Sequence, residues 1–227
     1  MIKIGMVMFK DMTQLDLTGP FEIFSRFPES QLYLISKSVN PVRSDRGLTI
    51  LPDTTFENCP EELDVLFVPG GPGVSSLLAD AGYLDFISLR GNKARYVTSV
   101  CTGSIVLAAC GLLRGYKATT HWLSIDLLER FGIETKNERV VIDDNRITGG
   151  GVTSGIDFAL VLAAMLFGEQ RAKEIQLLIE YNPQPPFSGG HPDVADHSIL
   201  TKVKEERKEI QKKRLDQIDQ FIRNNAK

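Results

Sequence analysis

Residues 96–107, which read YVTSVCTGSIVL, decide the fold of this chain. The first five residues predict a buried strand, and the residues from Gly103 onward predict a helix. Cys101 and Thr102 therefore have to connect a strand to a helix in very little chain. Ser99 and Gly103 stand two residues before and after the cysteine, which is the spacing of small residues that a sharp nucleophile elbow requires. The stretch predicts a strand–turn–helix unit with a cysteine at its tip.

The elbow makes Cys101 a candidate nucleophile. The turn is expected to point the thiol out of the sheet and to place it at a helix N-terminus, where partial positive charge lowers the pKa of a thiol. The alternative is a small buried cysteine that only fills a tight turn. Cys110 lies among alanines and leucines of the following predicted helix, which favours a role in core packing. Cys59 lies in a turn before Pro60 and has no expected role in the chemistry.

The segments around this unit predict strands that alternate with helices. Strands are predicted at 2–9, 31–38, 64–68, 96–100, 140–143 and 146–148, with a hairpin at 41–51. Helices are predicted at 15–27, 84–93, 103–113, 121–131 and 153–167, the first with Thr18 as its cap and Pro20 in its first turn. The alternation predicts an α/β fold, in which helices cover both faces of a parallel sheet.

The C-terminal part of the chain has a different character. Residues 182–191, NPQPPFSGGH, are too rich in Pro and Gly for a helix, and 193–225 form one long charged helical pattern. Acidic residues interleave with the basic ones there, which favours a solvated or dimer-contacting helix. We expect residues 1–192 to form a catalytic domain and 193–227 to be a helical extension of that domain.

Composition and charge exclude several classes of function. The net charge of −3 does not suggest a nucleic-acid partner, and the longest apolar stretch, 97–113, contains too many polar residues for a membrane helix. The start of the chain reads as a strand and the cysteine count is odd, so we expect reduced thiols in the cytoplasm. His191 and His197 lie outside any ligand cluster, and the Gly70–Gly73 loop lacks a phosphate-binding spacing, so we expect no metal and no cofactor.

Gly70 and Gly71 follow the predicted strand at 64–68. Ligands of open parallel sheets bind beyond the carboxyl ends of the strands, so this loop and Cys101 are expected at the same edge. The backbone N–H groups of Gly70 and Gly71 would face a developing negative charge, as in an oxyanion hole, or the two glycines would permit another segment of backbone to approach closely.

Other stretches accompany the elbow in a pattern that is familiar from one superfamily. They are 14–20 (QLDLTGP), 68–71 (VPGG), 118–122 (ATTHW), 138–141 (ERVV), 148–151 (TGGG), 154–159 (SGIDFA) and 180–183 (EYNP). With the elbow they resemble the DJ-1/PfpI superfamily from residue 2 to about 193. The resemblance implies a flavodoxin-like sandwich, a nucleophile elbow and a homodimer.

Three positions direct the resemblance toward the isocyanide hydratases of that superfamily. Thr102 follows the cysteine where the protease-like members usually have histidine, and the first loop supplies Asp16 where many members have glutamate. Regulators that share several of these stretches carry a further helix-turn-helix module, and this chain ends at Lys227, too soon for one.

The resemblance implies hydration of an isocyanide to an N-formamide. The Cys101 thiolate would attack the isocyanide carbon and Asp16 would protonate that carbon, giving a thioimidate that water converts to product. A carboxyl group beside a thiolate in a partly apolar pocket should have a raised pKa. The alternative for Asp16 is a helix cap. Thr102 would support the site through its hydroxyl or backbone N–H.

Further residues have secondary roles in this hypothesis. Gly150 and Val152 are expected to line the pocket, and His121 is expected to be a structural support near Cys101 rather than a base. Two other functions remain open at this point. One is a different thiol chemistry on the same scaffold, either glyoxalase-like or amide-cleaving, and the other is a non-enzymatic ligand or redox sensor that uses Cys101 as its switch.

Overall fold

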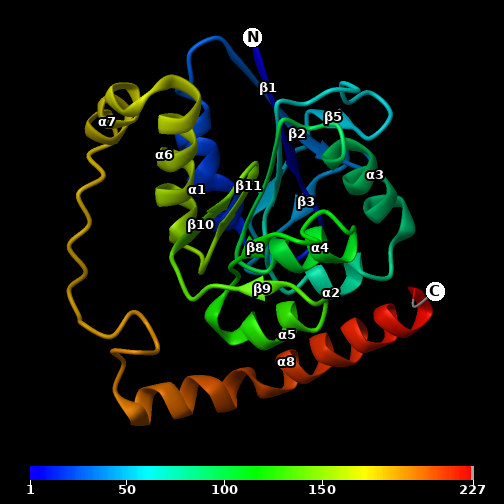
Figure 1. Ribbon diagram of the computed structural model, residues 1–227, viewed down its shortest axis with the longest axis vertical. Helices are drawn as coiled ribbons and strands as arrows, with labels where there is room; N and C mark the ends of the chain where they lie inside the picture. Colours follow the sequence, from blue (N-terminus) through cyan, green and yellow to red (C-terminus); the bar gives the residue numbers. More distant parts are fainter. Residues whose placement is uncertain (226–227) are drawn as a thin grey trace.

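A computed structural model of the protein describes residues 1–225, with a seven-stranded sheet at its centre (Figure 1). The strand order is β10-β11-β7-β6-β1-β2-β5, and every neighbouring pair is parallel except β10 and β11. The strands are β1 Ile2–Val7, β2 Ser30–Ser36, β5 Thr54–Thr55, β6 Val65–Val68, β7 Tyr96–Val100, β10 Val140–Asp143 and β11 Arg146–Gly149. The predicted parallel α/β fold is confirmed.

Helices cover both faces of this sheet, with α1 and α6 on one side and α3 and α4 on the other (Figure 1). The helices are α1 Gln14–Phe24, α2 Val74–Leu77, α3 Ala81–Gly91, α4 Gly103–Ala109, the 3-10 turn η1 Trp122–Ser124, α5 Ile125–Glu129, α6 Ser154–Phe167, α7 Glu169–Leu178 and α8 His197–Asn225. Two small sheets stand apart: the antiparallel pair β3 Val42–Arg43 and β4 Thr49–Ile50, and the parallel pair β8 Lys117–Ala118 and β9 Glu134–Thr135.

Three buried aromatic rings fix α1 and α6 against the sheet. The Phe24, Phe67 and Phe158 side chains are fully buried, and their ring centroids lie 5.6 to 6.0 Å apart. They come from α1, β6 and α6, so one aromatic cluster sets the position of both helices. The cluster contacts the last residue of α1, Phe24, and so holds this helix against the sheet.

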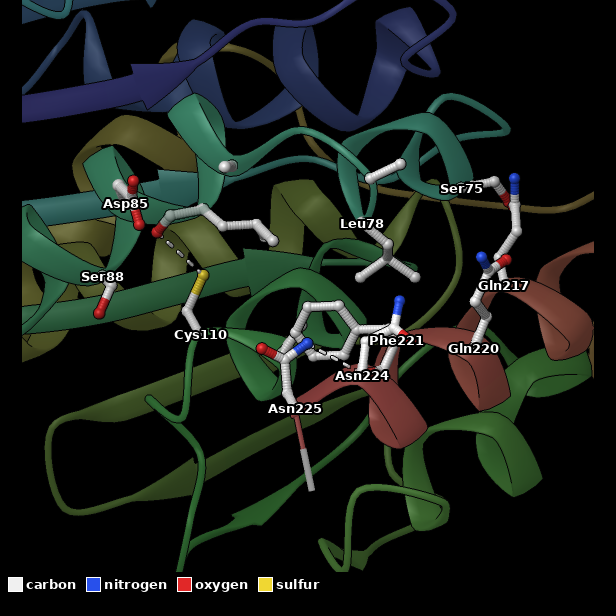
Figure 2. A pocket seen from close by; sticks show the side chains of 14 residues that line it. Ser75, Leu78, Asp85, Ser88, Cys110, Gln217, Gln220, Phe221, Asn224 and Asn225 are labelled. Carbon is white, nitrogen blue, oxygen red and sulfur yellow. Dashed lines mark hydrogen bonds between the residues drawn. The ribbon is translucent and has the colours of Figure 1, made fainter. Parts of the chain in front are cut away.

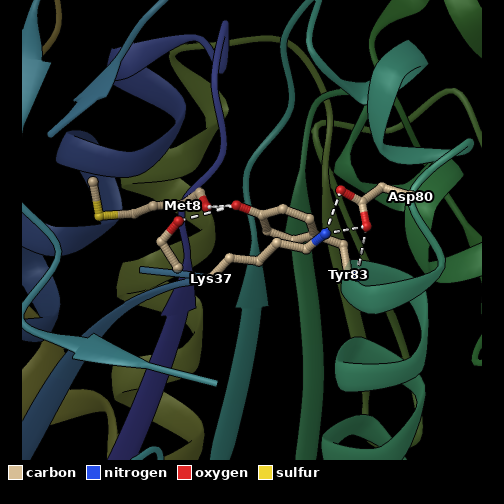
Figure 3. A network of polar contacts seen from close by, with 5 residues as sticks. Met8, Lys37, Asp80 and Tyr83 are labelled. Carbon is tan, nitrogen blue, oxygen red and sulfur yellow. Dashed lines mark hydrogen bonds and ion pairs between the residues drawn. The ribbon is translucent and has the colours of Figure 1, made fainter. Parts of the chain in front are cut away.

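A polar network ties α3 to the same edge (Figure 3). The Tyr83 hydroxyl donates to the carbonyl of Met8 at 2.9 Å, just after β1 ends, and contacts the Ser36 hydroxyl at 3.0 Å. The Lys37 ammonium contacts both carboxylate oxygens of Asp80, at 2.5 and 2.7 Å. The ends of β1 and β2 therefore have a fixed position relative to α3.

Some local predictions were wrong. The first helix begins at Gln14, so Pro20 lies well inside it rather than in its first turn, and the Thr18 hydroxyl donates to Gln14 instead of capping the helix. A proline at that place has no N–H for the carbonyl of Asp16 four residues earlier. The predicted helix over 121–131 is split into η1 and α5. The ten-residue helix α7 and the short elements α2, β5, β8 and β9 were not predicted.

The chain after α7 runs through residues 179–196 without helix or strand before α8 begins at His197. In Figure 1 this segment passes along the outside of the molecule, and α8 then crosses beneath α5 and α2. Arg214 and Ile218 are the buried residues of α8. Within residues 1–225, no helix combines the length and apolar character that a membrane crossing requires.

Candidate active site

Cys101 occupies the turn between β7 and α4 in a left-handed conformation, with φ of 56°. This conformation is unfavourable for a residue with a side chain and persists only where neighbours impose it. The Cys101 N–H donates to the carbonyls of Gly149 and Gly150 at 3.0 and 2.8 Å, and its own carbonyl accepts from the Thr120 hydroxyl at 2.9 Å. The structure shows a strand–turn–helix elbow, as the small-residue spacing predicts.

Residue 103, on the helical side of the elbow, has to be glycine for a steric reason. A Cβ atom at Gly103 would lie 2.1 Å from the carbonyl oxygen of Val68 and 2.8 Å from that of Pro69. Every other residue type would therefore displace the end of β6 or the start of α4. The elbow can be this tight only because residue 103 is glycine.

Asp16 lies in the first turn of α1 and is fully buried, with 0% of its surface exposed. Its Oδ2 accepts a hydrogen bond from the Gly70 N–H at 3.1 Å, and its Oδ1 has no N–H or O–H donor among the described residues. Burial raises the pKa of Asp16 to about 7, although contacts with the Cys101 thiol and the Gly70 N–H lower it in part. The predicted raised pKa is confirmed, and the carboxyl accepts from Gly70 rather than from an N–H of its own helix.

The Cys101 thiol is only 5% exposed. Burial raises its pKa well above the usual value, and the neighbouring Asp16 raises it further, whereas the Thr102 N–H and Arg214 lower it. The expectation that the helix N-terminus would lower this pKa overall is wrong, because desolvation outweighs the partial charge of a seven-residue helix. The resting protein therefore holds a protonated thiol beside a carboxyl group that titrates near neutrality.

The amides of Gly70 and Gly71 are used within the protein. Gly70 donates to Asp16, and Gly71 donates to the Thr102 hydroxyl oxygen at 3.0 Å. The expectation that these N–H groups face an oxyanion is therefore wrong for this conformation. The other expectation, close backbone approach, is confirmed, since a Cβ at Gly70 would lie 2.5 Å from the Thr102 nitrogen and one at Gly71 would lie 2.4 Å from that of Thr13.

A cavity of about 300 Å³ opens at the thiol. Its lining includes Cys101, Thr102, Gly71, His121 and Val152. Asp16, Gly70 and Gly150 are not among its lining residues. The expected lining position therefore holds for Val152 and not for Gly150, whose carbonyl accepts from the Cys101 N–H. Four further lining residues come from α8: Arg207, Ile210, Gln211 and Arg214. Sequence reasoning did not assign these α8 residues to the site.

His121 forms part of the cavity wall, and its imidazole is neutral at neutral pH. Burial, together with the charges of Arg214 and Arg207, lowers its pKa to about 4. Its Nδ1 accepts a hydrogen bond from the Leu123 N–H at 3.3 Å, which fixes the ring. A neutral, fixed imidazole agrees with the expected supporting role, which remains a prediction.

A larger cavity of about 570 Å³ lies between α3, α4 and the end of α8 (Figure 2). It contains the half-buried thiol of Cys110, which donates to the carbonyl of Leu84 at 3.5 Å. Burial and Asp85 raise the pKa of Cys110 to about 12, so this thiol stays protonated. Cys110 differs from Cys101 in that it does not occupy an elbow and has no contact with a fully buried carboxyl group that titrates near neutrality. Within residues 1–225, no group of three or more His, Cys, Asp or Glu is placed to bind a metal ion.

Comparisons with known proteins agree with this geometry. The sequence profile described as the DJ-1/PfpI family matches residues 2–165. An isonitrile hydratase of Pseudomonas putida is 50% identical over 203 residues, which are 89% of this chain and 89% of that one. A crystal structure of a ThiJ/PfpI family protein from Pseudomonas syringae has a TM-score of 0.93 at 44% identity, covering 96% of this chain and 90% of that chain. A glutathione-independent glyoxalase of Caenorhabditis elegans is 26% identical over 146 residues, 64% of this chain and 78% of that one.

Proposed function

The chain belongs to the DJ-1/PfpI family, and we propose that it is an enzyme that hydrates isocyanides to N-formamides, with Cys101 as its nucleophile. One observation carries the proposal: a fully buried carboxyl group, Asp16, with a pKa of about 7, interacts with the thiol of an elbow cysteine. Hydration of an isocyanide requires a nucleophile and a proton donor at the same carbon atom. The Cys101 thiol, which lines the cavity, supplies the nucleophile, and the Asp16 carboxyl that contacts this thiol supplies the proton.

The first half of the reaction forms the thioimidate. The terminal carbon of R–N≡C accepts the sulfur of Cys101, so a C–S bond forms while the thiol loses its proton to the Asp16 carboxylate. Asp16 then gives a proton to the same carbon, which yields R–N=CH–S–Cys101. A carboxyl group with a pKa near 7 suits this double role, because it is available both as base and as acid at neutral pH.

The second half releases the product. Water adds to the C=N carbon as Asp16 takes one of its protons, and Asp16 passes that proton to the nitrogen, which gives the tetrahedral adduct R–NH–CH(OH)–S–Cys101. The C–S bond then breaks, the proton of the adduct's hydroxyl group passes to the sulfur, and R–NH–CHO leaves. The Thr102 hydroxyl accepts from Gly71 N–H and donates to Gly71 O at 3.3 Å, which supports a role in holding the loop that contains the Asp16 partner Gly70.

The test uses cyclohexyl isocyanide and follows the absorbance of the formamide. We expect turnover by the wild type, and loss of turnover in Cys101→Ala and Asp16→Asn, while Cys101→Ala still binds the isocyanide. Cys110→Ala is the matched control, because it removes a half-buried thiol from the other cavity and should retain activity. No turnover by the wild type at any pH from 6 to 9 would refute the proposal, and turnover of methylglyoxal instead would assign the glyoxalase chemistry of the relative from Caenorhabditis elegans.

We also propose that the protein acts as a homodimer in the cytoplasm. Large apolar side chains are unusually exposed around the end of α7 and the segment that follows, with Leu177 at 81% and Phe187 at 84%. Such patches are typical of surfaces that a second copy covers. All three cysteines are unpaired thiols, which suits a reducing compartment. Sedimentation should give twice the monomer mass, and Phe187→Ser should weaken the association.

A further inference from the structure

The C-terminal helix α8 brings a buried arginine to the wall of the Cys101 cavity. Arg214 is only 5% exposed and lines the cavity together with Cys101 and Thr102. Its Nη2 donates to the carbonyl of Gly71 at 3.3 Å, and its Nη1 donates to the Ser124 hydroxyl at 3.2 Å. The same Gly71 carbonyl accepts from the Thr102 hydroxyl, so the guanidinium lies one hydrogen-bonded group away from the residue that follows Cys101.

Arg214 is buried without an anionic partner. None of the ion pairs in the described part of the chain includes it, and its Nε is buried without any hydrogen-bond acceptor. Removing a guanidinium from water is unfavourable unless an opposite charge compensates it. A methionine of similar length would fill the same space and pack α8 against the domain without removing a charge from water. The arginine therefore points to an anion that forms in the cavity.

The charged and titratable groups around the thiol identify that anion. Asp16 from α1 faces Cys101, and the other groups in the cavity lining are Asp45 and Arg46, His121, and Arg207 and Arg214. Arg46 and Arg207 are exposed to solvent, and Arg46 lies 3.9 Å from Asp45. Burial keeps the pKa of His121 at about 4, so this ring is neutral. Arg214 is thus the buried cation of this set. Asp16 is a buried acid too, but it does not line the cavity, so the Cys101 sulfur is the buried atom that shares the cavity with Arg214 and becomes negative during the proposed reaction.

We propose that Arg214 is a positioning residue whose guanidinium is the counter-charge of the Cys101 thiolate. The inference rests on the proposed function, because it takes Cys101 as the nucleophile. Burial and Asp16 raise the pKa of Cys101, and the charge of Arg214 lowers it in part. Burial lowers the pKa of Arg214, and Cys101 offsets part of that shift. The helix that carries Arg214 is therefore part of the reaction site, although it lies outside the region that the family profile matches.

Alkylation of the thiol tests this inference without any isocyanide. Iodoacetamide reacts with the thiolate, so the pH midpoint of Cys101 alkylation, read by peptide mass spectrometry on the full-length protein, reports its ionisation. Arg214→Met removes the charge and should raise the midpoint by about one pH unit or more, which is a tenfold loss of thiolate below the midpoint. Arg214→Lys keeps a charge and should hold the midpoint close to that of the wild type. Arg214→Gln serves as the uncharged variant if Arg214→Met does not fold.

Two controls separate charge from packing. Ile218→Ala loosens the buried contact of α8 without a change of charge, and Arg207→Gln removes an exposed charge from the same cavity. Neither should move the midpoint. Equal midpoints in Arg214→Met and the wild type, or equal shifts in Arg214→Met and Arg214→Lys, would overturn the inference and leave Arg214 a structural residue.

The outcome for Arg214 can be told apart from the outcome for the enzyme activity. If the wild type hydrates no isocyanide but Arg214→Met shifts the midpoint, the proposed substrate is wrong and the counter-charge stands. If the wild type is active, Arg214→Met should lower kcat about tenfold, change KM by less than about twofold and shift the rising limb of the pH–rate profile upward. An unchanged profile with full activity would overturn the role of Arg214 alone.

Discussion

The Asp16 carboxyl and the Cys101 thiol have coupled ionisations. Burial raises both pKa values, and the charge of Asp16 raises that of Cys101 further, whereas the hydrogen bond with the Cys101 thiol lowers that of Asp16 in part. The two groups together therefore retain a proton at pH values well above those at which a carboxyl group usually ionises. This property suits proton transfer to carbon. It also lowers the stability of the folded state at pH values where the carboxyl group would be ionised in the unfolded chain.

Asp16→Asn should therefore stabilise the protein at alkaline pH while it abolishes turnover. Burial raises the pKa of Asp16 from 3.8 to about 7, so the folded state retains a proton that the unfolded state has lost, and the wild type loses stability as the pH rises from 4 to 7. The full effect is about 4 kcal/mol above pH 7 and vanishes below pH 4. Urea unfolding at pH 4 and pH 8 measures it. An unfolding free-energy difference between variant and wild type that stays the same at both pH values would contradict the raised pKa.

At the scale of the elements, the elbow could be predicted from sequence because its requirement is local. Small residues at 99 and 103 follow from the geometry of a turn between β7 and α4. The raised pKa of Asp16 follows from the burial of its carboxyl group, whereas the neighbouring thiol lowers that pKa in part. The hydrogen bonds of the Gly70–Gly71 loop could not be predicted, since glycine specifies freedom of backbone and not the acceptor of its N–H. The strands β8 and β9 have two residues each, too few for a periodic pattern.

The α8 contribution was missed for a different reason. Charged residues dominate this helix, so the sequence alone predicts a solvated surface. A signal was nevertheless present: Ile210, Ile218 and Ile222 lie at helical spacing, and Arg214 stands between the first two, where an apolar residue is expected. An arginine at a core position of an amphipathic helix indicates a buried charge with a partner.

Gly103→Ala tests how strictly the elbow depends on glycine. The new methyl group would lie 2.1 Å from the Val68 carbonyl oxygen, so either β6 or α4 must move. We expect a loss of about 3 kcal/mol or more in unfolding free energy, and loss of Cys101 reactivity in the fraction that folds. Gly190→Ala is the control, because nothing lies within 4 Å of its Cβ, and its effect should stay within about 0.5 kcal/mol. Equal effects at the two positions would show that the elbow tolerates a side chain.

At the scale of the whole molecule, the site draws on both ends of the chain. The acid comes from the first helix, the nucleophile from the centre of the sheet, and four cavity-lining residues from the last helix. The connection to α8 runs through residues 179–196, which form no helix or strand. The position of α8 therefore depends on its own contacts with the rest of the protein. These contacts include the buried side chains of Arg214 and Ile218 and the Arg130–Asp219 ion pair at 2.6 Å.

We propose accordingly that residues 193–227 are an extension of the catalytic domain and not an independent unit. Removing them uncovers the cavity and exposes the apolar surface beneath Ile218, so the shortened chain should unfold at a lower temperature, alkylate faster at Cys101 and lose most turnover. Asp219→Asn in the full chain is the control. It breaks only a partly exposed ion pair, for which about 1 kcal/mol or less is expected. Melting temperature and turnover measured side by side decide the matter, and a shortened chain that keeps both within error would show that α8 is dispensable and that the cavity is complete without it.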